Sequence, residues 1–361
     1  MPSIFEMITA QALAMYTETL ETNRIPYAGE SMFPNEKKMG LKLDWIKGYD
    51  NLPVILAPSA FDAKPVLRDR GGVNQESTKM PFFRESMRLG EEDRQQLLMF
   101  LEANNEAYAK TIINKLYDDA NNLVEGARIV AEVMRMALIA NGAFTISSST
   151  DKGNYVKYEY NYDPSGEWNT KNNTTLLTTA RWSDHANSNP VLDFLEVKKK
   201  AQRTGKVITR VILGYETWQD ICANEKIAKD MNPIGNANII ITEDDVKAYM
   251  TKKTGISILV YDKMYQDQDG NDQYFYPTRG TATFLPAGTL GKTWFGTTPE
   301  EADLMSGNTL ADVSIVNTGI AISTEKIALP VNLITWVSEI VLPSFENMNS
   351  VYNIKYTPDE D

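Results

Sequence analysis

The sequence predicts an α+β protein with more than one lobe. Three observations carry this prediction: a helical pattern of unusual length, a later stretch in which helices and strands alternate, and a C-terminal part that contains strands only. The chain has 361 residues, which exceeds the usual size of one compact domain. Hydrophobic residues make up 42% of it, which is enough for a substantial apolar core.

Residues 1–52 are expected to form an N-terminal arm. Helix-forming residues with loosely spaced apolar positions occupy 3–22, and Pro26 and Pro34 then interrupt the pattern. The following apolar run, 41–49, is short and mixed. We therefore expect an arm that is mobile or that takes its structure from a partner.

Residues 53–92 are predicted to form an extended loop. This segment holds several prolines and the Gly71-Gly72 pair, and it shows no helical period of useful length. A structureless segment of this length in a compact domain is usually functional or disordered. Because a solitary two-stranded hairpin is only marginally stable in water, we expect this one to lie on another subunit.

A long helix is predicted at about residues 104–141, inside the segment 93–190. Apolar residues recur at steps of three and four from Tyr108 to Leu138, so they form one stripe on a helix. About 35 helical residues would span roughly 50 Å, far beyond the mean helix of about 12 residues. Asn141-Gly142 marks the end of the helix. No heptad is sustained, which argues against a coiled coil.

After this helix, aromatic and polar residues alternate over 156–162 and predict a strand, whereas 169–175 is polar and predicts a turn. From Pro190 the pattern is α/β, and later apolar runs predict strands without an intervening helix. The predicted helices are 191–203, 216–231 and 242–253. The predicted strands are 207–213, 256–261, 273–276, 281–285, 312–322, 331–341 and 351–356, with a tight turn at Asp269-Gly270.

The inventory of reactive residues argues against an enzyme. His185 is the only histidine, which excludes multi-histidine metal sites, and no Ser-His-Asp or Cys-His site is predicted around it. We expect His185 to be a structural or surface residue. Cys222 is the only cysteine, so no disulfide forms within the chain, and we expect a buried, inert thiol.

Two motifs resemble ligand-binding loops and lack a required glycine. Gly291-Lys292-Thr293 resembles the end of a phosphate-binding loop, but Pro286 stands where its first glycine is needed. Asp267–Asp272 resembles a calcium loop, but Asp272 replaces its glycine and Thr278 its final glutamate. We expect a plain loop at the first motif and a hairpin turn at the second. No catalytic, cofactor-binding or metal-binding residue is predicted.

The charge and hydropathy of the chain limit the partners and the compartment that we expect for it. A net charge of -12 argues against a dedicated nucleic-acid binder. The basic cluster of Lys198–Lys200, Arg203 and Lys206 is expected to be a solvated helix end, and a subunit-contact or DNA-facing role is the lesser alternative. No stretch approaches the roughly 20 apolar residues of a membrane span, and the start lacks the pattern of a signal peptide. We expect a soluble protein made in a reducing cytoplasm.

Within residues 256–291 an apolar strand ends in Val260-Tyr261, and a tyrosine, a short acidic hairpin and Phe284-Leu285-Pro286 follow it. This series of motifs resembles the phage lambda major head protein family. Val66–Gly72 resembles the family's extended loop, which carries a basic turn ending in Gly-Gly, and Trp218 lies in a short helix after a strand, as in the family. The order of elements resembles the Hong Kong 97-type fold of tailed-phage capsid proteins.

This resemblance implies a major capsid protein that assembles into hexamers and pentamers of an icosahedral shell around double-stranded DNA. It implies a peripheral domain at 93–190 with the long helix as its spine, an axial domain at 191–309, and strands at 310–361 that return to the peripheral domain. No cross-linking chemistry is expected of Lys64 or Lys79, because the lambda-like branch does not use it. The inter-subunit contact candidates are Lys64, Arg68, Asp69, Arg70, Gly71, Gly72, Phe82 and Phe83.

The implied partners are further copies of the chain, a portal, a separate scaffolding protein and packaged DNA bound without sequence recognition, with a decoration protein left open. No membrane contact is implied. Assembly is expected in the cytoplasm of the bacterial host, and the protein is then part of the virion. Two alternatives stay open: an encapsulin-like cellular compartment, and a cytoplasmic hydrolase that uses converging acidic residues.

Overall fold

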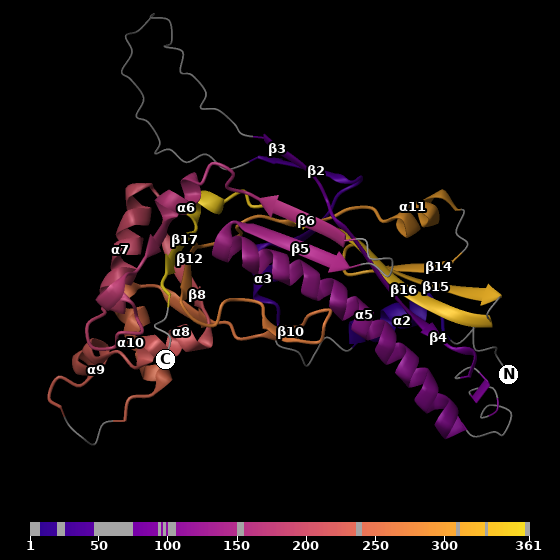
Figure 1. Cartoon of the computed structure of the whole chain (residues 1–361), viewed down its shortest axis with the longest axis horizontal. Coiled ribbons are helices and arrows are strands. Elements are labelled where there is room, and N and C mark those ends of the chain that lie inside the picture. Colours follow the sequence, from indigo (N-terminus) through magenta and orange to yellow (C-terminus); the bar gives the residue numbers. More distant parts are fainter. Residues whose placement is uncertain are drawn as a thin grey trace, which may run out of the picture. The chain divides into compact units, whose positions relative to one another are not determined.

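The computed structural model of the chain is shown in Figure 1. It describes residues 8–19, 26–46, 75–92, 95–96, 99, 106–149, 155–235, 240–307, 311–328 and 331–357. The chain divides into two compact units, each assembled from separate parts of the sequence. Unit 1 consists of Met1–Asp44, Ser77–Met134 and Lys292–Ser344, and unit 2 of Trp45–Glu76, Arg135–Gly291 and Phe345–Asp361.

The predicted long helix is confirmed as α5, Glu106–Asn141, with 36 residues. Its stop is also confirmed: Gly142 has a φ of 69°, and its N–H donates to the Leu138 carbonyl at 2.8 Å. A Cβ at this position would lie 2.9 Å from the Trp168 ring, so the turn needs glycine. The buried residues of the predicted stripe are Ala120, Leu123, Ala127, Met134 and Leu138.

Unit 1 is built on a sheet to which the C-terminal strands contribute most. Its strands are β1 (Asn35–Lys37), β4 (Phe82–Leu89), β13 (Thr293–Phe295), β14 (Asp312–Val316), β15 (Ile320–Ala328) and β16 (Val331–Pro343). β16 pairs antiparallel with β15, β4 and β13, and β1 adds to β13 in parallel. The strands predicted over 312–322 and 331–341 are therefore confirmed, with a turn at Asn317–Gly319 dividing the first into β14 and β15.

The described part of the N-terminal arm is packed into unit 1, so the prediction of a mobile arm is wrong for these residues. α2 (Ala10–Thr19) lies against β14 and β15, and Leu13 on it is buried. The backbone N–H of Ala10 donates to Asp312 Oδ2 at 2.8 Å. The loosely spaced apolar residues of this segment form a helix because the sheet supplies the surface that they cover.

A second short helix fixes the arm to α5 within unit 1. This helix, α3 (Ala28–Met32), places the backbone N–H of Gly29 2.9 Å from the buried carboxylate of Glu132. The Tyr27 hydroxyl donates to Glu125 at 3.1 Å. Both acceptors lie on α5, so residues 26–32 are held on the long helix by its acidic side chains.

Part of the predicted extended loop is a strand of unit 1. β4 pairs with β16 along its whole length, from Leu89 opposite Leu333 to Phe82 opposite Ile340. The prediction that this part needs another subunit as its support is therefore wrong, because β16 supplies the pairing edge. β3 (Gln75–Lys79) pairs with β2 (Lys42–Ile46), and residues 47–74 lie outside the described residues.

Unit 2 contains a mixed five-stranded sheet in the order β7-β17-β12-β8-β9. Its strands are β7 (Asn173–Thr175), β8 (Ile208–Leu213), β9 (Ser257–Val260), β12 (Thr281–Pro286) and β17 (Tyr352–Lys355). Alternate strand residues, such as Val211 and Phe284, form one core cluster with residues of α7 (Pro190–Arg203), α8 (Tyr215–Cys222) and α10 (Glu243–Thr254). These helices therefore cover one face of the sheet, and they gather beside it in Figure 1.

The opposite face of this sheet meets the last turn of α5. Asn353 on β17 donates from Nδ2 to the carbonyls of Ile139 and Ala140 at 3.2 and 3.1 Å. The last carbonyls of a helix have no partner within it, so this buried asparagine supplies one. The described residues after Ser344 belong to unit 2. The predicted domain boundaries at 190/191 and 309/310 stay predictions.

Helices in unit 2 follow the predictions, with two differences. The predicted helix 216–231 is two helices, α8 and α9 (Glu225–Met231), because the Asn224 side chain caps α9 and ends the first helix. The predicted turn at 169–175 is α6 (Glu167–Asn172) followed by β7. α10 starts as predicted, with Thr242 as its N-cap.

Two-stranded hairpins complete unit 2. The predicted strand at 156–162 is β6 (Tyr155–Asn161), and its partner β5 (Ala143–Ser149) was not predicted. The hairpin around Asp269-Gly270 is confirmed as β10 (Met264–Gln266) and β11 (Asp272–Tyr274). A further helix that was not predicted, α11 (Pro299–Ser306), lies in unit 1.

Candidate functional site

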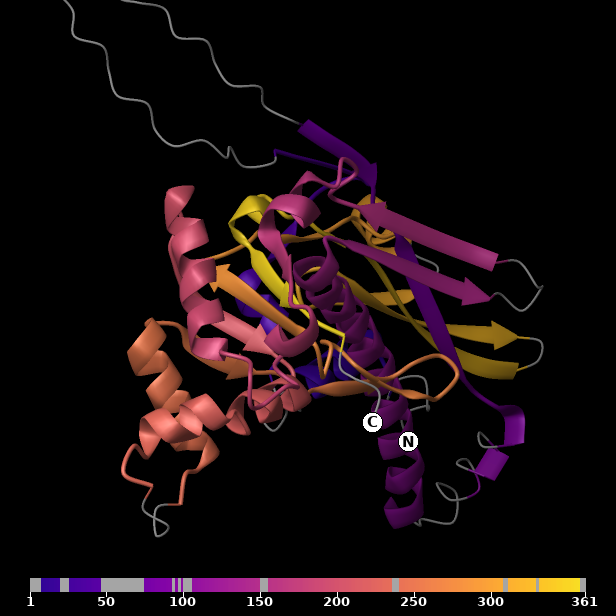
Figure 2. The ribbon, with the colours of Figure 1, turned by 60° about the vertical axis from the view of Figure 1, so that its left-hand side comes forward.

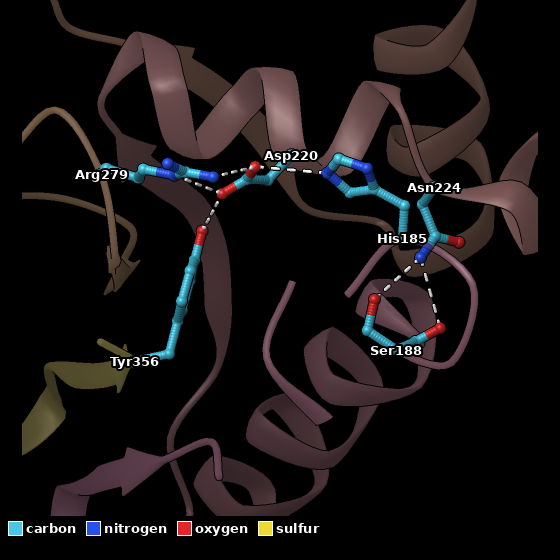
Figure 3. Close-up of polar contacts among 6 residues, drawn as sticks. All are labelled: His185, Ser188, Asp220, Asn224, Arg279 and Tyr356. Carbon is cyan, nitrogen blue, oxygen red and sulfur yellow. Dashed lines mark hydrogen bonds and ion pairs between the residues drawn. The ribbon is translucent and has the colours of Figure 1, made fainter. Parts of the chain in front are cut away.

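A polar cluster in unit 2 surrounds the buried carboxylate of Asp220 on α8 (Figure 3). Arg279 donates to it twice, from Nε to Oδ2 at 3.1 Å and from a terminal nitrogen to Oδ1 at 3.2 Å. The Tyr356 hydroxyl donates to Oδ2 at 2.8 Å, and His185 Nε2 lies 3.3 Å from Oδ1. These four residues form the Asp220 cluster, which ties α8 to separate segments of the unit.

A neighbouring group of hydrogen bonds fixes the segment that carries His185. Asn224 Nδ2 donates to the Ser188 hydroxyl at 2.9 Å (Figure 3), and Asn224 Oδ1 accepts from the backbone N–H groups of Lys226 and Ile227 in the first turn of α9. The backbone N–H of Glu225 donates to the His185 carbonyl at 2.9 Å. The turn segment 181–189 is therefore attached to the junction of α8 and α9 by main-chain and side-chain bonds.

The Asp220 cluster has the chemistry of a structural tie. Ser188 is buried and its hydroxyl accepts a hydrogen bond from Asn224, so this residue takes part in fixing the segment. Burial, followed by the charge of Asp220, raises the pKa of the Tyr356 hydroxyl, which therefore stays a proton donor. The expectation of a structural role for His185 agrees with this geometry.

Cys222 lies at the end of α8 and borders a cavity of about 320 Å³, which α9 and the start of α10 also line. Burial, followed by the charge of Glu243, raises the pKa of its thiol to about 12. Because the thiolate is the reactive form, this thiol is a poor nucleophile at neutral pH. Cys222 is half-buried and not fully buried as predicted, and the raised pKa agrees with the expectation of an inert thiol.

A second buried acidic group lies in unit 1, at the start of α11. Glu300 accepts hydrogen bonds from Trp336 Nε1 at 3.0 Å and Ser338 Oγ at 2.7 Å, both on β16, and from Arg84 on β4. Burial acts to raise the pKa of Glu300, but the bonds from Ser338 and Trp336 and the charge of Arg84 outweigh it, so this pKa is lowered. Glu301 next to it pairs with Lys37 on β1. We call these residues the Glu300 cluster.

The aspartates between β10 and β11 form a turn, as predicted. Asp267 Oδ1 accepts from the backbone N–H groups of Asp269 and Asn271 at 3.0 and 2.9 Å. These bonds, that from Asn271 foremost, hold the pKa of Asp267 below its ordinary value. The carboxylate is thus committed to the turn. Within the described ranges, no group of histidine, cysteine and acidic side chains is placed to hold a metal ion.

Of the predicted contact residues, Phe82 and Phe83 are described. Both are half-buried on β4, and the guanidinium of Arg84 lies 4.8 Å from the centre of the Phe82 ring. Their pairing with β16 places them in the sheet of unit 1. The remaining candidates lie outside the described residues: Lys64, Arg68, Asp69, Arg70, Gly71 and Gly72.

The predictions for the basic cluster on α7 and for Thr293 need correction. The cluster at the end of α7 is only partly solvated, because Lys198 donates to the Thr254 carbonyl and Lys206 to the Asn349 carbonyl, both at 2.6 Å. Lys199 and Arg203 are exposed. Thr293 was predicted in a loop, but it is buried and begins β13, where its hydroxyl donates to the Phe33 carbonyl at 2.9 Å.

Neither Asp220 nor the pair Glu300 and Glu301 was predicted as a site residue. Arg279 and Tyr356 are separated from Asp220 by 59 and 136 residues, so no local spacing connects them. For Glu300 and Glu301 a signal was present, since acids directly after Thr298-Pro299 mark a helix start. None of the helices in the described ranges combines the length and apolar character needed to cross a lipid bilayer.

Solved structures place the fold among phage capsid proteins. A putative capsid protein of a prophage of E. coli CFT073 is 15% identical, with 97% of this chain and 99% of that chain covered and a TM-score of 0.56. A phage-related protein of Bordetella bronchiseptica RB50 is 12% identical, with 96% of this chain and 97% of that chain covered and a TM-score of 0.55. The capsid of cyanophage A-1(L) is 9% identical, with 94% of this chain and 95% of that chain covered and a TM-score of 0.54. The likeness confirms an α+β fold of the Hong Kong 97 type.

The sequence model of the family described as phage major capsid protein E matches residues 9–318. The chain belongs to this family. It is therefore a shell-forming structural protein of the phage capsid that assembles with copies of itself, as the resemblance implied. A search of curated proteins found no match.

Proposed function

We propose that copies of this chain form hexamers and pentamers that close into an icosahedral shell around double-stranded phage DNA. The match to the capsid family over residues 9–318 is the observation that carries the proposal. Closed symmetry lets many modest contacts act together, so no single contact has to be strong. The protein itself acts through its surfaces and has no catalytic activity.

Within such a shell we assign α5 and the sheet of unit 1 to the peripheral domain, and the α/β part of unit 2, from residue 191, to the axial domain at the capsomer centre. The length of α5, 36 residues, supports the assignment to the peripheral domain. The sheet of unit 2, which three helices cover, supports the assignment to the axial domain. The loop before β4 is proposed to contact a neighbouring subunit through the residues from Lys64 to Gly72.

The proposed partners are a portal, a separate scaffolding protein and, where the phage has one, a decoration protein. DNA is proposed to be enclosed without sequence recognition, and assembly to take place in the bacterial cytoplasm. The net charge of -12 supports weak contact with DNA, since tight binding needs clustered cations. The family match favours a phage capsid over a cellular compartment or an acid-based hydrolase.

The proposal is tested by purifying the full chain and following its assembly by sedimentation velocity and negative-stain microscopy. Capsomers and closed shells are expected. The loop contact is tested by the Arg68→Glu/Arg70→Glu variant, for which folded subunits that no longer close into shells are expected. Lys252→Glu/Lys253→Glu on α10 is the control with the same change of charge. Shells of normal yield from the loop variant would contradict the loop contact, and a wild-type chain that never assembles would contradict the function.

A further inference from the structure

The outer side of α7 carries an exposed stripe that combines apolar and basic residues. Leu192 and Leu195 are 54% and 38% exposed, although large aliphatic side chains are usually covered. Lys199 and Arg203 continue the same line at steps of four residues and are exposed. We call these four residues the α7 face. Glu196, an exposed acid, lies one turn before Lys199 on the same helix.

The hairpin of β10 and β11 carries a stripe of the opposite charge. Met264 and Tyr274 are paired in register and are 44% and 42% exposed, so they form one apolar spot on the hairpin. Asp262 before β10, Asp269 in the turn and Asp272 at the start of β11 are also exposed. We call these five residues the hairpin face. A two-stranded hairpin gains little stability from its own pairing, so an apolar spot on it is stabilised by a partner that covers it.

Both faces belong to unit 2, and the elements that carry them lie apart from each other. In Figures 1 and 2, α7 lies on one side of strands β12 and β8, and the hairpin of β10 and β11 extends on the other side. One copy therefore cannot bring its own two faces together. Two different faces on opposite sides of a subunit are what a head-to-tail ring requires.

We propose that the α7 face of one copy binds the hairpin face of the next copy around a capsomer. This inference rests on the proposed function, because it names the surfaces through which the axial domains would meet. Lys199 and Arg203 would lie against Asp269 and Asp272, and Leu192 and Leu195 would cover Met264 and Tyr274. Opposite charges set partner choice and orientation at such contacts, and the apolar side chains supply buried area.

A second copy fits these faces better than other occupants do. DNA would be attracted by Lys199 and Arg203 but repelled by the acids of the hairpin face, so it leaves half of the pattern unexplained. A partner of different sequence would need its own pair of complementary faces. A second copy supplies both from the residues already described, and the contact repeats at each step around a ring.

The test is a charge exchange in the full chain. The variants are Lys199→Glu/Arg203→Glu, Asp269→Lys/Asp272→Lys, and the combination of all four changes. Asp267 stays unchanged because its carboxylate builds the turn. Lys247→Glu/Lys252→Glu, on exposed positions of α10, matches the charge change of the first variant. Circular dichroism establishes that each variant is folded, and sedimentation velocity over a concentration series measures assembly.

We expect each single-face variant to need at least about tenfold more protein for half-assembly, because like charges then meet at each repeated contact. The combined variant is expected to return close to the wild-type value, and the control to stay there. Folded single-face variants that assemble normally, or a combined variant that stays impaired, would overturn the inference and leave the shell function standing. A loss of DNA binding without a change in assembly would also overturn it. A wild-type chain that never assembles would overturn both.

Discussion

The Asp220 and Glu300 clusters use the same chemistry in the two units. Each centres on a buried carboxylate that binds an arginine and neutral donors from other segments. They differ in what surrounds them. Tyr356 of the first packs on Trp182, with ring centres 5.7 Å apart, and Trp182 packs on Phe194 in the core. Glu300 lies in the first turn of α11, and the residues that follow this turn, 302 to 307, are exposed.

This difference in surroundings separates two roles for a buried acid. Loss of the Asp220 carboxylate would release segments that enclose the core of unit 2, so its effect should spread through the unit. Loss of Glu300 would release one end of a short helix and one point of contact between β4 and β16. The same hydrogen bonds are therefore expected to contribute unequally to stability.

The largest loss in the free energy of unfolding is expected for Asp220→Ala. This change leaves the Arg279 guanidinium and the Tyr356 hydroxyl without their acceptor, and breaking a buried charge pair costs about 3 kcal/mol. Urea unfolding of the purified chain measures it. Glu216→Ala, an exposed change on the same helix, is the control and should cost less than about 0.5 kcal/mol. Equal stabilities of the two variants would refute the role assigned to the Asp220 cluster.

For Glu300→Ala we expect a smaller loss in the free energy of unfolding, about 1–2 kcal/mol. Trp336 and Ser338 lose their acceptor, whereas Arg84 can still reach water. The lowered pKa of Glu300 makes its contribution present above its unfolded pKa of about 4.3 and lost as pH falls through the folded value. The difference between wild type and variant should therefore shrink in acid. A difference that stays constant down to about pH 3 would contradict this account.

Asp193 in unit 2 should show the opposite dependence on pH. Burial raises the pKa of its carboxyl to about 6, although Trp182 donates to it at 2.7 Å. A raised pKa means that its contribution is full below the unfolded value of about 3.9 and is lost as pH rises through about 6. Asp193→Asn should stabilise the chain by about 1 kcal/mol at pH 8 and little at pH 4. Equal effects at both pH values would show that Asp193 does not titrate in this range.

The smallest change in the free energy of unfolding is expected for Lys229→Gln. Lys229 pairs with Glu225 at 3.7 Å on α9, and both side chains are exposed. Exposed pairs of this kind contribute less than about 0.5 kcal/mol. The same urea measurement checks it. A loss comparable with that of Glu300→Ala would mean that burial does not distinguish the clusters from surface pairs.

Local signals predicted much of this fold. The stripe on α5, its end at Gly142, the Thr242 cap of α10 and the turn at Asp267 each depend on residues a few positions apart. The resemblance to the lambda-type family likewise rests on short motifs in order along the chain. These features are visible in a sequence because helix periods, caps and tight turns are short-range.

The features that were missed depend on distant pairing. β4 is a strand because β16, more than two hundred residues later, offers it an edge. The N-terminal helix α2 is fixed by β14 and β15, which lie near the other end of the chain. The Asp220 cluster joins residues from four separate segments. No period or motif in the sequence records such partners, so the arm and the loop were predicted to be less ordered than their described parts are.

The central claim is that this chain builds a closed shell through its surfaces, and cryo-electron microscopy of the purified wild-type chain tests it most directly. The account predicts closed particles of repeated rings, with unit 2 meeting unit 2 of the next copy around each ring. Subunits that stay single at every concentration, or that grow into open filaments without closure, would contradict it.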